Sequence, residues 1–118
     1  MLLATLAVAG CGAKSPSAPQ PPYAARGTET LSGPPLPARS SFCHSFNNAK
    51  AGAVSADITP RSIHLVVGAG PCSAPGQMLA ENDGEVANVE APAGANHVTM
   101  ANRADVDTAW TLRITHWY

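Results

Sequence analysis

The sequence predicts an all-β protein: a small antiparallel β-sandwich or open barrel of about six short strands, preceded by a disordered, proline-rich tether. Two observations lead to this fold class. Seven of the eleven prolines lie between residues 12 and 41, so they are separated from the rest of the chain. From residue 42 onward, apolar side chains recur at every second position, which is the period of a strand rather than of a helix.

The two parts of the chain differ in what they can bury. Residues 12–41 contain few apolar side chains to offset the entropy lost on ordering, so we expect a disordered spacer, with a proline-rich docking ligand as the alternative. Residues 42–118 are predicted to form the folded domain. The whole chain has 118 residues and a formal net charge of −1, which argues against a nucleic-acid partner.

The first two predicted strands follow each other closely. Residues 53–58 form a weakly alternating segment that ends before Pro60, which cannot continue a strand ladder. Ile63, Leu65 and Val67 then alternate with other residues, and we expect them to face the core.

The next two strands, 77–80 and 85–90, flank Asn82-Asp83-Gly84. Asp-Gly between two short strands is typical of a tight hairpin turn, because both residues tolerate a positive φ. The sequence therefore predicts that these two strands pair with each other.

The last two strands show the clearest alternation. Val98 and Met100 mark the fifth, and Trp110, Leu112 and Ile114 share one face of the sixth. The polar residues between them face the opposite way.

The chain then ends in His116-Trp117-Tyr118, with Trp117 on the face opposite Trp110. We expect Trp117 to cover the second face of the sandwich. The alternative is that Trp117 and Tyr118 anchor a partner, since these residue types dominate binding hot spots.

The N-terminus carries a targeting motif. A short apolar run, residues 2–8, leads into Val8-Ala9-Gly10-Cys11 and is too short to span a bilayer. This order resembles the lipobox of bacterial lipoproteins. The resemblance implies that residues 1–10 are a signal peptide, that Cys11 carries a covalent lipid, and that 11–41 link it to the domain. It also implies a cell-envelope location, and the outer membrane facing the periplasm in a host with two membranes, because Gly12 is not the aspartate that marks inner-membrane retention.

The cysteine count agrees with this interpretation. If Cys11 carries lipid, Cys43 and Cys72 remain, and an oxidising envelope favours a disulfide between them over a pair of metal-binding thiols. Small lipoproteins that inhibit lysozyme are similar in size, anchor and disulfide, although their Ser-Gly-containing loop motif is not found here.

The sequence contains none of the catalytic motifs that would indicate an enzyme, and apart from the lipid on Cys11 no cofactor is expected. We therefore predict a membrane-anchored envelope lipoprotein that presents a small disulfide-bonded domain as a binding or structural module, with an envelope protein as the expected partner. The alternative is a periplasmic copper or zinc module that uses His64, His97 and His116.

Overall fold

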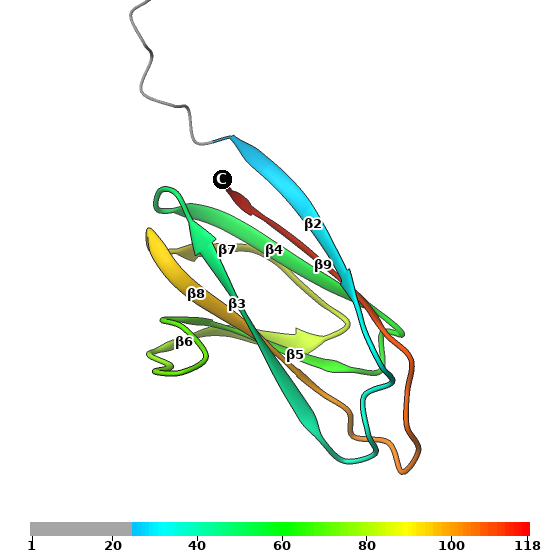
Figure 1. The fold of residues 1–118 in the computed structure, drawn as a ribbon. Helices are drawn as coiled ribbons and strands as arrows, with labels where there is room; N and C mark the ends of the chain where they lie inside the picture. Colours follow the sequence, from blue (N-terminus) through cyan, green and yellow to red (C-terminus); the bar gives the residue numbers. More distant parts are fainter. Residues whose placement is uncertain (1–24) are drawn as a thin grey trace, which may run out of the picture.

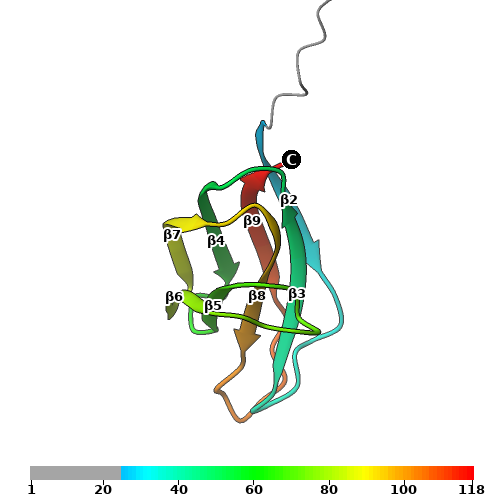
Figure 2. The same ribbon diagram turned by 90° about the vertical axis from the view of Figure 1, so that its left-hand side faces the viewer.

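The computed structural model describes residues 25–118, which form two antiparallel four-stranded sheets packed face to face (Figures 1 and 2). The first sheet has the order β2-β9-β4-β7 and the second β3-β8-β5-β6. In chain order the strands are β2 (Arg26–Ser32), β3 (Ser41–Asn48), β4 (Gly52–Thr59), β5 (His64–Ala69), β6 (Met78–Asp83), β7 (Glu85–Ala91), β8 (Gly94–Ala101) and β9 (Thr111–Trp117). The predicted all-β sandwich is confirmed.

The core lies between the two sheets and follows the predicted alternation. Leu65, Val98, Met100, Leu112 and Ile114 have no exposed surface at all. They come from one strand of the first sheet and two of the second, so the inward faces of both sheets meet in one apolar layer.

The predicted boundary between tether and domain at residue 42 is wrong. Arg26–Ser32 forms β2, which pairs with β9 over its full length. Leu36 is only 4% exposed and exchanges two 2.9 Å backbone hydrogen bonds with Thr108. β2 contains one large apolar residue, Leu31, so its sequence shows almost no hydrophobic pattern. Its position in the sheet depends instead on backbone pairing with β9, which begins 85 residues further along the chain. Residues 1–10 and the part of the predicted tether before residue 25 lie outside the described residues.

The number of strands was also underestimated, because β2 and β3 were not predicted. β3 begins one residue before the predicted domain and reads SFCHSFNN, a mostly polar sequence. Only Phe46 and Asn48 in this strand are buried, as expected for an edge strand that pairs on one side with β8.

The predicted hairpin at Asn82-Asp83-Gly84 is wrong. Asn82 and Asp83 belong to β6, which pairs with β5, whereas β7 belongs to the other sheet and pairs with β4. Gly84 alone separates the two strands, and one residue is too short to reverse the chain. Its N–H donates to the Ile63 carbonyl and its carbonyl accepts from the Ile58 N–H, both at 2.9 Å. Its φ of +77° lets the chain bend around this corner from one sheet to the other.

Both ends of the described chain lie at the same end of the sandwich (Figure 1). Arg26 is paired with Trp117, and the Tyr118 N–H donates to the Ala25 carbonyl at 2.9 Å. No helix in the described part of the chain is long and apolar enough to cross a membrane.

Candidate functional site

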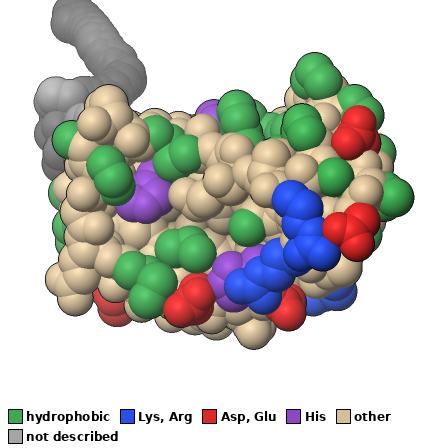
Figure 3. Space-filling view, turned by 90° about the horizontal axis from the view of Figure 1, so that it is seen from below, with side chains coloured by type: hydrophobic (Ala, Val, Ile, Leu, Met, Phe, Trp, Pro, Cys, Tyr) green, Lys and Arg blue, Asp and Glu red, His purple; other side chains and the backbone are tan. Residues whose placement is uncertain are grey.

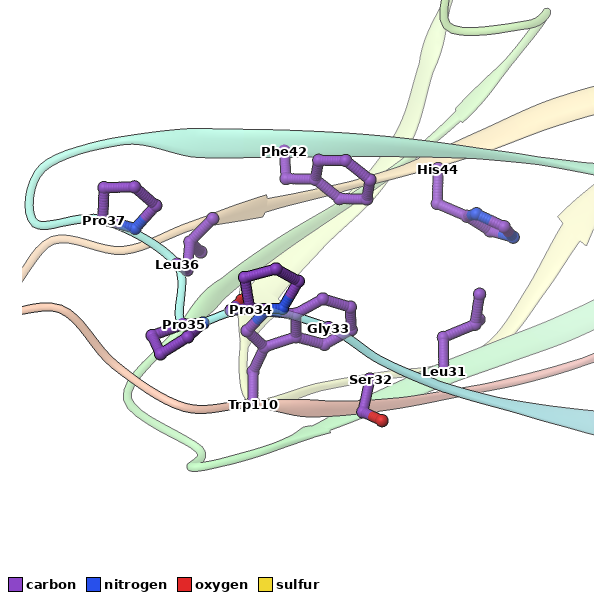
Figure 4. A pocket seen from close by; sticks show the side chains of 10 residues that line it. All are labelled: Leu31, Ser32, Gly33, Pro34, Pro35, Leu36, Pro37, Phe42, His44 and Trp110. Carbon is purple, nitrogen blue, oxygen red and sulfur yellow. The ribbon is translucent and has the colours of Figure 1, made fainter.

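An apolar cleft of about 480 Å³ opens between β2 and β3, the edge strands on one side of the sandwich. These two strands belong to different sheets and do not pair with each other, and the cleft lies between them. Figure 4 shows Phe42 and His44 on one wall and the end of β2 with Trp110 on the other. The lining residues are Leu31, Ser32, Gly33, Pro34, Pro35, Leu36, Pro37, Phe42, His44 and Trp110.

Trp110 is held firmly in one wall of the cleft. Its indole Nε1–H donates to the Pro34 carbonyl at 3.0 Å, and its ring lies 6.2 Å from that of Phe42. Phe42 is 48% exposed, which is unusual for so large an apolar side chain. The cleft therefore presents one fixed and one accessible aromatic ring.

The proline-containing segment that lines one end of the cleft, residues 33–37, is also fixed. The buried amide of Asn102 donates to the carbonyls of Leu36 at 3.0 Å and Pro37 at 3.2 Å. These bonds tie the β2–β3 connection to the β8–β9 connection. The prolines restrict the backbone further, so the cleft is largely formed before any ligand binds.

A polar network adjoins the cleft at His44. The Nε2 atom of His44 lies 3.2 Å from one carboxylate oxygen of Glu29, and Nε2 of His116 lies 3.4 Å from the other. Tyr118 stacks on His116, with ring centroids 4.3 Å apart, and desolvation raises its pKa with a further contribution from the charge of Glu29. The network thus places a carboxylate between two imidazoles beside an otherwise apolar site.

The predicted disulfide between Cys43 and Cys72 is confirmed. It joins β3 to the loop between β5 and β6, and the Cys72 N–H also donates to the Ser45 hydroxyl at 2.9 Å. Because β3 pairs with a neighbour on one side only, this crosslink stabilises the strand that carries Phe42 and His44.

Trp117 does not belong to the core, contrary to the prediction. It lies on the outer surface of its sheet against Gly52, with Lys50 Nζ 4.2 Å from the ring centroid and the Arg26 guanidinium at 5.8 Å. Its indole N–H is buried without a hydrogen-bond partner. Tyr118 is 53% exposed.

The three histidines proposed as metal ligands have separate partners. His97 Nδ1 bonds to the Gly70 carbonyl at 2.9 Å, His116 lies in the other sheet, and His64 bridges two carboxylates. Among residues 25–118, no group of three or more histidine, cysteine or acidic side chains is arranged to hold a metal ion.

His64 is the histidine with the clearest electrostatic environment. Its Nδ1 lies 2.7 Å from Asp83 and its Nε2 lies 2.8 Å from Glu81. The hydrogen bond to Asp83, followed by that to Glu81, raises the pKa of His64 above its ordinary value. Both contacts favour the imidazolium, so His64 has a structural role in joining β5 to β6.

Sequence reasoning missed the cleft because most of its lining was assigned to the tether. Leu31 and Leu36 are two large apolar residues among many prolines. They are the feature of the sequence that could have indicated that this segment packs on the domain. Trp110 was predicted to face the core, and it is partly buried against it.

No protein-family model matches this sequence, and no curated protein sequence matches it. Among solved structures, the fold is similar to that of Aeromonas hydrophila PliG, a periplasmic lysozyme inhibitor of g-type lysozyme. The TM-score is 0.51, the sequence identity is 12%, and the match covers 80% of this chain and 85% of that one. At this identity the similarity is one of fold.

Proposed function

We propose that this chain is a non-enzymatic lipoprotein of the bacterial cell envelope that binds a protein partner through the cleft between β2 and β3. The cleft carries the proposal: its lining is almost wholly apolar, it is held open by fixed segments, and Phe42 stands exposed at its mouth. Aromatic side chains in a preformed apolar site are typical binding hot spots.

The fold supports a first partner to test. The similar structure, PliG, is an inhibitor of g-type lysozyme in the periplasm, and this chain is predicted to enter the same compartment. A lysozyme is therefore the partner class that we propose.

Inhibition of wall hydrolysis by a purified g-type lysozyme tests this proposal. We expect the chain to slow clearing of a cell-wall suspension, and Phe42→Asp to abolish the effect. Val106→Asp is the matched control, because Val106 is 65% exposed and does not line the cleft. No inhibition by the wild-type chain, or equal inhibition by both variants, would contradict the proposal.

The anchor is tested separately by labelling cells with a radioactive fatty acid. The thiol of Cys11 is the proposed attachment point, so Cys11→Ser should remove the label and release the protein from the membrane. Equal labelling of both forms would show that Cys11 is not lipidated.

A further inference from the structure

The basic side chains of the domain fall into two groups. Arg39, Arg61, Arg103 and Arg113 each lie within 4 Å of an acidic partner. Figure 3 shows basic and acidic side chains side by side on the end of the molecule that it displays. Arg26 and Lys50 are the two basic residues of the described part that form no such ion pair, and both are exposed.

The two unpaired cations meet at one tryptophan. Arg26 is opposite Trp117 in the strand register, and Lys50 lies over the same ring from the loop between β3 and β4. The Trp117 backbone is fixed there, because its N–H donates to the buried Asn48 side chain at 2.9 Å and its carbonyl accepts from Ala49 at 2.8 Å. Tyr118 follows it at the same end of the sandwich and is exposed, with its ring stacked on that of His116. We call Arg26, Lys50, Trp117 and Tyr118 the basic-aromatic patch.

The patch lies where the described chain begins, beside Ala25. Positions 12–25 separate it from Cys11, and a chain of that length reaches at most about 50 Å when fully extended. If Cys11 is anchored, as proposed above, this is the end of the sandwich that the tether enters, so the patch lies within about 50 Å of the anchor.

We propose that the basic-aromatic patch docks the domain on an anionic phospholipid surface. Exposed lysine and arginine are attracted to anionic lipid, and tryptophan and tyrosine favour the bilayer–water interface. The domain as a whole is acidic, since the described residues include all eight acidic side chains and every basic one except Lys14. Screening confines attraction to about 8 Å at physiological salt, so the local excess at the patch determines the docking orientation.

Binding to lipid vesicles tests the patch without the anchor. The chain from position 11 onward, carrying Cys11→Ser, is sedimented with vesicles of phosphatidylglycerol and phosphatidylcholine, or of phosphatidylcholine alone, at low and high salt. We expect binding only to the anionic vesicles and its loss at high salt. Each of Arg26→Gln and Lys50→Gln should lower the partition coefficient about fivefold.

Arg61→Gln is the matched control, because it removes the same charge at the opposite end of β4, where Arg61 pairs with Glu85. We expect it to change binding less than twofold, and 10 mM inorganic phosphate not to compete. Equal losses for Arg61→Gln and Lys50→Gln, or equal binding to both kinds of vesicle, would overturn the proposal. The unlipidated chain keeps this result separate from the labelling and inhibition experiments, so the docking surface and the proposed function can fail independently.

Discussion

The two ends of β9 each carry a tryptophan, and the protein holds the two side chains in different ways. Trp110 precedes the strand, packs against the core, and donates its N–H to the Pro34 carbonyl. Trp117 ends the strand on the outer surface, and its N–H is buried with no acceptor. The N–H of Trp110 has its hydrogen-bond acceptor, and the ring forms a wall of the cleft. The ring of Trp117 is held between the cations on one face and Gly52 on the other side.

This difference shows that burial alone does not define a tryptophan's role. A ring with a satisfied N–H can fix the shape of a site, because moving it breaks a hydrogen bond as well as apolar contacts. A ring whose buried N–H has no acceptor gives up part of the stability that its burial provides, so it is held mainly by the contacts around it. Trp110 thus fixes the shape of the cleft that we propose as the binding site, and Trp117 belongs to the surface patch that we propose to contact lipid.

The largest effect should come from removing the disulfide that stabilises the cleft wall. Replacing Cys43 and Cys72 by serine removes a crosslink between residues 29 positions apart, so the unfolded chain gains conformational entropy. We expect the free energy of unfolding to fall by about 3.5 kcal/mol. Urea melts would measure the loss. The cleft should weaken more than the patch, so vesicle binding should persist where the variant is folded. An unchanged melt would show that β3 does not depend on the crosslink.

Trp110→Ala should be the next most damaging change. It removes a large side chain packed on the core and leaves the Pro34 carbonyl without its donor, so we expect a loss of about 3 kcal/mol. Trp117→Ala should cost clearly less, because it lies outside the core. Denaturant melts of the two variants would check this order, and equal losses would remove the distinction between the two ends.

Replacing each tryptophan by phenylalanine isolates the N–H. Trp110→Phe breaks a satisfied hydrogen bond and should cost about 1 kcal/mol beyond the lost ring area. Trp117→Phe removes a buried donor that has no partner, so the lost area should be offset and stability should change little. Differential scanning calorimetry of both variants gives the comparison, and a larger loss for Trp117→Phe would mean that its N–H has an acceptor.

The smallest effect concerns His64, which lies in the other sheet and serves as a reference region. Its pKa is raised in the folded state, so its stabilisation is complete below its ordinary value near 6.5 and is lost as pH rises through the folded value. Both partners are exposed, so we expect less than about 1 kcal/mol. The stability difference between wild type and His64→Gln should shrink from pH 5.5 to 8.5 in urea melts. A difference that is constant across this range would contradict the assignment.

Part of the candidate site could be predicted from local pattern and part could not. The pairing of Cys43 with Cys72 followed from the number of cysteines, and the burial of Leu112 and Ile114 followed from alternation. Phe42 and the prolines of the cleft were not predicted as a site, because they lie on segments that look like a linker. Their proximity to Trp110 depends on two connections that Asn102 ties together.

The sequence by itself determined the period of the strands and the inward faces of β5, β8 and β9. These properties depend on neighbouring residues, so a linear pattern records them. Only the tertiary structure decided the strand partners. Of the pairs in the two sheets, only β5 with β6 joins consecutive strands, and every other pair is formed over a longer separation. Backbone hydrogen bonds carry little side-chain information, which is why no local pattern indicated the position of β2 or the pairing of the strands on either side of Gly84.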